Sequence, residues 1–168
     1  EMYDKSGFDV KVLVCSIIPP ETSGWFAQEI ESPEDLENLK MRFFGLGGTV
    51  MEKLGVSVTV LPGAEIFPAL EKGVIDATEY GLPSIDENQG FHKLVKYNYF
   101  PGWHQQVSVS ELLMNKGEWN KLSEQHQTMI KIGLGESVMH TFAETEAKNF
   151  GAMGVMQKKH GVKVRRWP

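Results

Sequence analysis

Arg42 is the residue whose surroundings in the sequence point most directly to chemistry. It stands in the short apolar stretch 41–44, directly before the glycine-rich stretch 45–48. A guanidinium is planar and permanently charged, so it can bind a carboxylate through two parallel hydrogen bonds. Glycines let a backbone bend sharply at a strand end, where ligands of open α/β sheets bind. Arg42 is therefore either a carboxylate-binding residue or half of a structural ion pair with Glu79 or Glu21, and the sequence alone leaves both open.

A second group of candidate residues combines acidic and aromatic side chains. Glu79 and Tyr80 belong to the segment 74–81, which is expected to form a buried strand, and a buried charge needs a partner or a ligand. Trp25 and Trp103 each follow a glycine in an expected proline-containing loop. Each tryptophan taken alone fits packing in the core better, whereas beside unpaired polar groups both fit the walls of a small pocket.

Familiar catalytic and nucleotide-binding motifs are missing from the sequence. The glycine-rich stretch lacks the last glycine of a dinucleotide-binding loop, because that position is Val50, and no Walker lysine follows. The five histidines form no H-E-x-x-H pattern, and there is no G-x-S-x-G elbow. Cys15, the single cysteine, excludes an internal disulfide and lies in an expected strand, where it packs as an inert small side chain. Catalysis and nucleotide binding are the weaker interpretations.

The composition is that of an acidic globular protein. Hydrophobic residues make up 41% and charged residues 23% of the chain, a balance that argues against disorder. The net charge of -5 leaves no basic surface for nucleic acid, which is not expected as a partner. No apolar run approaches the ~20 residues that span a bilayer. The sequence starts with neither methionine nor a signal peptide, so we expect a mature piece of a longer chain.

Alternating strands and helices are expected over the first hundred residues, which predicts βαβ crossovers and a mainly parallel sheet. Ser32, Pro33 and Asp35 form an N-cap, first-turn proline and capping-box acid, typical of a helix start. Strands are expected over 10–16 (buried), 41–44, 56–62 and 74–81, and helices over 32–39, 48–54 and 64–73. Residues 91–106 are aromatic-rich and irregular, followed by a long strand over 107–116, one or two helices over 120–161 and a short strand over 162–168.

Three segments carry a family resemblance: DLENLKMRFFGLGGTVMEKLGV (35–56), PGAEIFPALEKGVIDATEYGLPSID (62–86) and YFPGWHQQ (99–106). In order and spacing they resemble the substrate-binding proteins of tripartite ATP-independent periplasmic (TRAP) transporters, the DctP-like family, near its 2-oxo acid and lactate branch. The resemblance implies a type II-like periplasmic-binding-protein fold, in which two α/β lobes close on a small organic acid. This chain is expected to be an incomplete, C-terminal part of that fold. Residues 1–100 would form the α/β substrate-binding lobe, and 101–168 the cross-lobe strand, the long helices and the terminal strand.

The same resemblance implies a binding site. It assigns substrate binding to Arg42, Trp25, Phe44, Glu79, Tyr80, Trp103 and Gln105, and a metal to Glu21, Glu79, Tyr80 and Gln105. Arg42 would pair with the substrate carboxylate through two hydrogen bonds. In cation-binding members, the residue at the position of Glu21 is commonly glutamine, and the residue at the position of Gln105 is often acidic. Because this sequence differs at both positions, the resemblance leaves open whether a cation binds. An oxygen-rich set suits Na⁺ or Ca²⁺ rather than zinc, and no cofactor is otherwise expected.

The expected function is that of a non-enzymatic periplasmic solute-binding protein. It would capture a small organic acid (a 2-oxo acid, a lactate-like or another monocarboxylate) and deliver it to the membrane permease subunits of a TRAP transporter. A homodimer is also among the expected partners. Two other classes remain open from the residues: an α/β enzyme acting on a small carboxylate, and a ligand-sensing module of a receptor. Turnover of organic acids would favour the first, and a membrane-spanning segment in the full-length protein the second.

Overall fold

The structure, a computed structural model, describes residues 2–167, which group into two compact units. We call Glu1–Pro19 with Val107–Glu146 the ribbon unit, and Pro20–Gln106 with Ala147–Pro168 the sheet unit. This grouping differs from the boundary expected at residue 100, because the first long strand pairs with a strand that lies beyond residue 106. One helix, α6 (Glu124–His160), contributes residues to both units.

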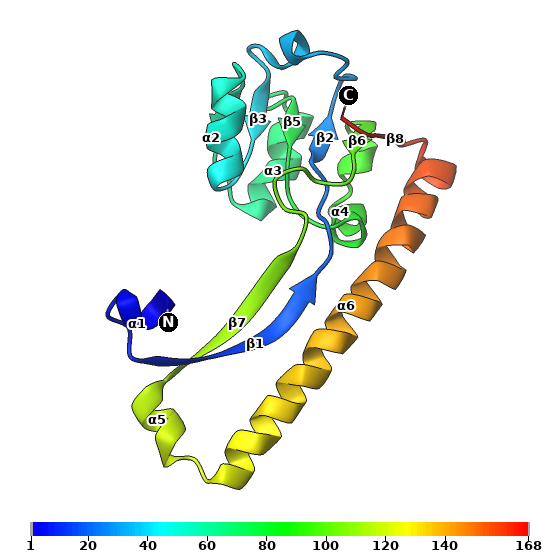
Figure 1. Cartoon of the computed structure of the whole chain (residues 1–168). Helices are drawn as coiled ribbons and strands as arrows, with labels where there is room; N and C mark the ends of the chain where they lie inside the picture. The colour runs from blue at the N-terminus through cyan, green and yellow to red at the C-terminus, as the bar shows by residue number, and fades with distance from the viewer. Residues whose placement is uncertain (1, 168) are drawn as a thin grey trace. The chain divides into compact units, whose positions relative to one another are not determined.

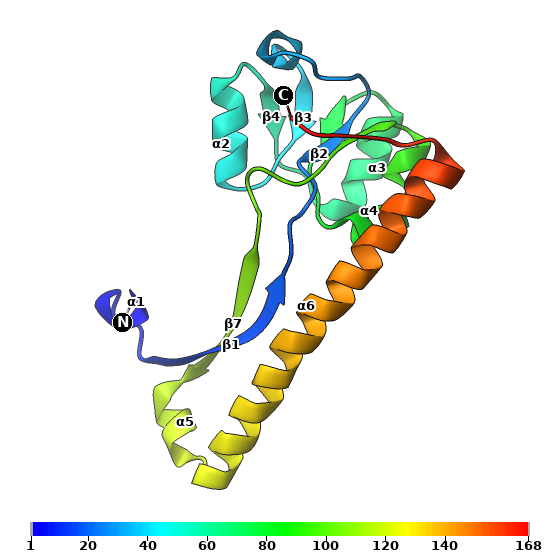
Figure 2. The same ribbon diagram turned by 45° about the vertical axis from the view of Figure 1, so that its right-hand side comes forward.

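The ribbon unit is built on two long antiparallel strands, β1 (Val10–Ile18) and β7 (Ser108–Asn115), which both views show side by side (Figures 1 and 2). Two short helices, α1 (Met2–Lys5) and α5 (Lys116–Lys121), precede β1 and follow β7. The strand expected over 10–16 is present, but its expected burial is wrong: every residue of β1 is partly or fully exposed, because within residues 2–167 β1 pairs with β7 alone.

The sheet unit contains a six-stranded sheet in the order β4-β3-β5-β2-β6-β8. Its strands are β2 (Gly24–Phe26), β3 (Lys40–Arg42), β4 (Ser57–Thr59), β5 (Ala77–Thr78), β6 (Tyr97–Tyr99) and β8 (Lys163–Arg165). The pairs of β3 with β4, β3 with β5 and β6 with β8 are parallel, whereas β2 runs antiparallel to β5 and β6. The mainly parallel sheet is thus confirmed, but it is mixed, because β2 and β6 were not expected as strands.

Short helices connect the strands of the sheet unit (Figure 1). They are η1 (Pro33–Leu36), α2 (Leu46–Lys53), α3 (Gly63–Glu71), α4 (Pro83–Gln89) and η2 (Phe91–Lys93). The capping box at Ser32 and Asp35 is present, although the turn that it starts is a 3-10 helix. The bend before α2 depends on Gly45, whose φ of 69° is a conformation that L side chains rarely adopt. No helix within residues 2–167 is both long and apolar enough to cross a membrane.

Two apolar clusters pack against the sheet of the sheet unit. Trp25 and Phe26 are neighbours on β2 but belong to different clusters, because successive side chains of a strand point to opposite faces. Phe26 packs with Met41, Phe43, Met51 and Tyr99 among others, and Trp25 packs with Ile66, Ile75, Phe91 and Met156 among others. The ends of the parallel strands β3, β4 and β5 are therefore held between two packed layers.

Candidate functional site

Arg42 ends β3, and its buried guanidinium is held by residues that follow the two neighbouring parallel strands. Its Nη1 donates to the main-chain oxygen of Glu79 (2.6 Å) and to Glu79 Oε2 (3.0 Å), directly after β5. Its Nε donates to the carbonyl of Leu61 (3.3 Å), two residues after β4. Because parallel strands bring their carboxyl ends to one edge of the sheet, these groups meet where ligands of such sheets bind. The ion pair with Glu79, expected as one of two alternatives, is present.

Glu79 is a buried carboxylate with one oxygen already engaged. Besides Arg42, its Oε2 accepts a hydrogen bond from the main-chain N–H of Phe44 (3.3 Å). Burial raises the pKa of Glu79, while the Arg42 guanidinium and the Phe44 N–H act in the opposite direction. Phe44 as a residue is 67% exposed, and it contacts Glu79 through its main-chain N–H.

Glu21 and Gln105 meet through both side chain and backbone. Gln105 Nε2 donates to Glu21 Oε1 (2.7 Å), and the Glu21 N–H donates to the Gln105 carbonyl (3.1 Å). The N–H of Gly102 donates to the Glu21 carbonyl (2.7 Å), which ties the segment before β2 to the segment after β6. Burial and the nearby Glu79 carboxylate raise the pKa of Glu21 to about 7, against the attraction of Arg42.

His104 completes this cluster and was not among the residues selected from the sequence. Its Nε2 lies 4.0 Å from Glu79 Oε1, and its side chain is only 8% exposed. Phe43 and Trp103 pack around the ring at centroid distances of 4.9 and 5.4 Å. Neither ring nitrogen has a hydrogen-bond partner within residues 2–167, and burial lowers the pKa of the imidazole. The signal available in the sequence was its place next to Gln105 in the segment 99–106.

Asp86 is a completely buried acidic residue, and it was also not among the site residues selected from the sequence. Its Oδ2 accepts hydrogen bonds from Thr22 Oγ1 (2.9 Å) and Trp25 Nε1 (2.8 Å). Complete burial raises the pKa of Asp86 to about 7, although both hydrogen bonds oppose this rise. Besides burial, the Glu79 carboxylate raises the pKa of Glu21, and both glutamates raise the pKa of Asp86, so a positive charge bound among these three acids would be stabilised.

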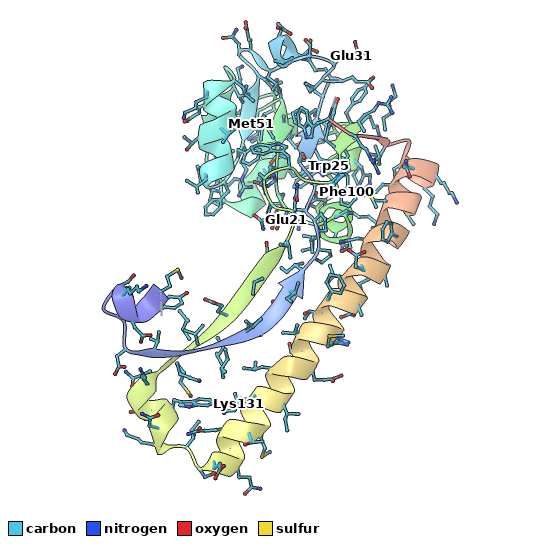
Figure 3. All side chains as sticks on the ribbon, in the orientation of Figure 1. Glu21, Trp25, Glu31, Met51, Phe100 and Lys131 are labelled. Carbon is cyan, nitrogen blue, oxygen red and sulfur yellow. The ribbon has the colours of Figure 1, made fainter. Side chains whose placement is uncertain are left out.

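The two tryptophans expected in the pocket differ in position. Trp25, which is labelled in Figure 3, lies on β2 rather than in a loop and is completely buried in the core, where its indole N–H donates to Asp86. Trp103 is 36% exposed and lies between Phe43 and His104. The ring of Tyr80 lies 5.8 Å from the Arg42 guanidinium and packs edge-on against Phe91. The expected residues Arg42, Glu79, Glu21 and Gln105 are thus gathered in one place, with Trp103 and Tyr80 beside them.

The sequence matches one protein family over residues 21–167, the bacterial extracellular solute-binding proteins of family 7 (DctP). Among curated relatives, a monocarboxylate 2-oxoacid-binding periplasmic protein of Nostoc sp. is 41% identical over 133 residues. That match covers 79% of this chain and 36% of the Nostoc protein.

Solved structures of TRAP solute-binding proteins share the fold. One from Bordetella bronchiseptica, with copurified calcium and picolinate, has a TM-score of 0.85 and 36% identity over 99% of this chain and 49% of its own. One from Pseudoalteromonas atlantica, with bound sodium and pyruvate, has a TM-score of 0.82 and 30% identity over 99% of this chain and 50% of its own. The chain therefore spans about half the length of these structures and about a third of the Nostoc protein.

Proposed function

Because this chain belongs to the family 7 (DctP) bacterial extracellular solute-binding proteins, we propose that it contributes the carboxylate-binding wall of a TRAP solute-binding protein. The observation that carries the proposal is Arg42, a permanent cation buried at the ends of three parallel strands. The ligand class is a small monocarboxylate of the 2-oxo acid or lactate type. The Nostoc protein and the structures with picolinate and pyruvate support that choice.

Arg42 would receive the ligand carboxylate on the side of its guanidinium that Glu79 leaves open. Within the described residues no hydrogen bond involves Nη2, so two of its N–H bonds remain available. A bidentate ligand would also need either Nη1, which now donates to Glu79 Oε2 (3.0 Å), or Nε, which now donates to the Leu61 carbonyl (3.3 Å). Binding through Nη1 and Nη2 requires Glu79 to yield its hydrogen bond, and a bound cation that attracts the Glu79 carboxylate would help it to do so.

A cation would also remove the repulsion between an incoming carboxylate and the acidic residues of the site. The expected ligands Glu21, Glu79 and Gln105 lie together, and Tyr80 follows Glu79 in the chain. Burial raises the pKa of both Glu21 and Glu79 although Arg42 acts against this rise, so a bound cation would stabilise their ionised forms and the residues present fit one. The calcium or sodium in the related structures is consistent with this cation site.

In the whole protein, we expect the other residues to shape and close the pocket. Trp103 would form an apolar wall beside the ligand, Phe44 would supply its backbone N–H and ring, and Tyr80 would lie over Arg42. Trp25 would contribute indirectly, through the hydrogen bond that its indole N–H donates to Asp86. The protein would bind the acid in the periplasm without converting it and deliver it to the membrane permease, with a homodimer as a further proposed assembly.

Calorimetry with pyruvate in calcium-containing buffer tests the proposal on the whole protein. Arg42→Lys should weaken pyruvate binding about tenfold or more, because an ammonium cannot replace a bidentate guanidinium. Arg166→Lys is the matched control, since Arg166 is exposed on the same unit, and should leave the affinity unchanged. Equal affinities for the wild type and Arg42→Lys would restrict Arg42 to the structural ion pair with Glu79 and contradict the proposal.

A further inference from the structure

We propose that the end of α6 and the edge strand β8 form a docking surface for an acidic, extended segment of another protein, which would add to the sheet as a further strand. The surface belongs to the sheet unit, where β8 follows directly on the end of α6 (Figure 1). It shares no residue with the carboxylate site, so the inference goes beyond the proposed function.

The charges of the chain are strongly segregated toward this surface. Residues 88–106 and 147–168 contain eight of the 17 lysines and arginines and none of the 22 acidic residues, although the chain as a whole is acidic. The two segments lie side by side, because β6 pairs with β8 and the rings of His92 and His160 stack at a centroid distance of 4.2 Å. Their exposed basic side chains include Lys93, Lys96, Lys158, Lys159, Lys163 and Arg166. A surface of one sign attracts a partner of the opposite sign.

Contacts within the unit account for only part of this positive charge. Arg165 is paired with Glu29. Lys158 and Lys159 stand in the last turn of α6, where the helix dipole favours cations. Arg166 lies beyond β8, is exposed, and has no acidic partner within residues 2–167. Its guanidinium is therefore available to a carboxylate of another molecule.

One edge of β8 is open among the described residues, because β8 is the last strand of the sheet. On the side of β6, the Lys163 N–H donates to the Lys96 carbonyl (2.8 Å). On the same side, the Arg165 carbonyl accepts from the Phe100 N–H (2.9 Å). Main-chain groups of successive strand residues point to opposite sides, so those of Val164 face the open edge, where its carbonyl is approached by the Arg165 guanidinium (3.5 Å). Such an edge can pair with a strand of another chain, and its basic side chains would repel a basic strand and admit an acidic one.

A cavity of about 410 Å³ lies between α6 and this edge. Its walls include Phe100, Phe150, Met153, Val164, Arg165 and Arg166. Phe150 is 63% exposed, although it is a large apolar side chain. The combination of apolar walls with guanidinium groups fits a segment that carries one apolar side chain between carboxylates, with the apolar side chain against Phe150 and the carboxylates on the arginines.

An anionic membrane would also be attracted by the basic side chains of this surface. It has no strand that could pair with the main chain of Val164, and the cavity has room for a side chain at the strand edge itself. The open edge and the cavity together therefore favour a protein segment as the partner.

Fluorescence anisotropy on the whole protein tests the proposal with a labelled peptide of the sequence DEDLFEDE. We expect this peptide to bind at least tenfold more tightly than KRKLFKRK, its basic counterpart. Arg166→Glu should weaken binding tenfold or more. Lys72→Glu is the matched control, because it makes the same change of charge at an exposed position of the sheet unit outside this surface, and it should change binding little.

The contribution of the cavity is tested by Phe150→Ala, which should weaken binding of DEDLFEDE about fivefold or more. Leu46→Ala is its control, because Leu46 is another exposed apolar residue of the sheet unit and does not line the cavity. All four substituted side chains are exposed, and the melting temperature of each variant verifies that it is folded.

Two further probes separate strand addition from attraction between charges. A form of DEDLFEDE with N-methylated main-chain amides keeps its charge but cannot donate to a strand edge, so it should bind at least tenfold more weakly. Phosphatidylglycerol vesicles should bind the protein no better than phosphatidylcholine vesicles. The inference is overturned if the acidic peptide does not bind, if Arg166→Glu or N-methylation leaves its binding unchanged, or if phosphatidylglycerol vesicles bind the protein through Arg166 and the peptide does not.

Discussion

The sheet unit and the ribbon unit differ most in how much apolar surface each buries within itself. The sheet unit has two apolar clusters on its sheet and holds nearly all of the buried apolar side chains among residues 2–167. In the described part of the ribbon unit, only Pro19 and Trp119 are buried apolar residues. Trp119 of α5 is covered by Lys11 and by Lys131, the latter labelled in Figure 3, and their ammonium groups lie 5.7 and 5.8 Å from the centroid of its ring.

The ribbon unit instead exposes many large apolar side chains. They are Met2, Phe8, Val14, Val107, Val109, Leu112, Leu113, Met129, Ile132, Met139 and Phe142. Two strands alone are marginally stable in water, so this unit depends on surfaces outside itself far more than the sheet unit does. The comparison teaches that the candidate site is placed on the unit with its own core, where side chains can be held in fixed positions.

Truncation of a core side chain should have the largest effect, and the loss of stability should differ between the two units. Phe26→Ala in the sheet unit should lower the free energy of unfolding by about 3–5 kcal/mol, because Phe26 is completely buried against Tyr99 and Trp167. Leu113→Ala in the ribbon unit should cost less than about 1 kcal/mol, because Leu113 is 48% exposed. Urea unfolding measures both, and equal losses would contradict the contrast between the units.

Asp86→Asn should change the pH dependence of stability. The pKa of Asp86 is raised from 3.8 to about 7 in the folded chain, so the native state binds this proton more tightly than the unfolded state. The free energy of unfolding therefore falls as pH rises from about 4 to 7, by about 2–4 kcal/mol from this group.

Asparagine keeps an acceptor for Thr22 and Trp25 but has no proton to lose, so the variant should lose this component of the slope. Urea unfolding at several pH values between 4 and 8 measures it. Glu111→Gln provides the comparison in the ribbon unit, where Glu111 is exposed and accepts a hydrogen bond from Tyr3 (2.8 Å). A slope in Asp86→Asn as steep as in the wild type would show that other groups cause it.

A methyl group added at Gly102 should disturb the candidate site. Its Cβ would lie 2.8 Å from the main-chain oxygen of Glu21, and the backbone cannot retreat without moving Glu21. Gly102→Ala should therefore cost about 1–3 kcal/mol and weaken cation binding. Gly135→Ala in the ribbon unit meets no atom within 4 Å and should stabilise α6 by up to about 1 kcal/mol. Thermal unfolding and calorimetry compare the two, and unchanged values for Gly102→Ala would contradict the tight packing of this loop.

The smallest expected effect concerns self-association through the ribbon unit. Met129, Ile132 and Met139 are exposed at helical spacing on one side of α6, and such a patch favours association. We expect the 168-residue chain to form dimers in solution, and Ile132→Glu to weaken dimerisation about tenfold. Leu46→Glu is the control, because Leu46 is a highly exposed side chain of the sheet unit. A monomer by light scattering at every concentration, or equal weakening by both variants, would contradict this expectation.

The sequence by itself determined what depends on neighbours along the chain. The capping box at Ser32, the glycine bend at Gly45 and the alternation of β3, α2, β4, α3 and β5 were predictable, because propensity and turn chemistry are local. The place of Arg42 on a strand before the glycine bend was predictable for the same reason, although the strand ends at Arg42 and not at Phe44 as expected. Glu79 and Glu21 were considered as partners of Arg42 from the residues alone, and family resemblance added Gln105. One or two helices were expected over 120–161, and the structure has one long helix there, α6, preceded by the short α5.

Only the tertiary structure decided which side chains are buried and which face one another. β2 and β6 are three-residue strands that owe their conformation to the strands that they pair with. They are too short to show an alternating hydrophobic pattern in the sequence, so they were not predicted. Trp25 is in the core and β1 is exposed because burial depends on what covers a strand, which the strand's own residues do not specify. The positions of His104 and Asp86 near Glu79 likewise depend on the tertiary structure. They lie 25 and 7 residues from Glu79 in sequence, and only the folding of the sheet brings the three acids and the imidazole into one low-dielectric cluster.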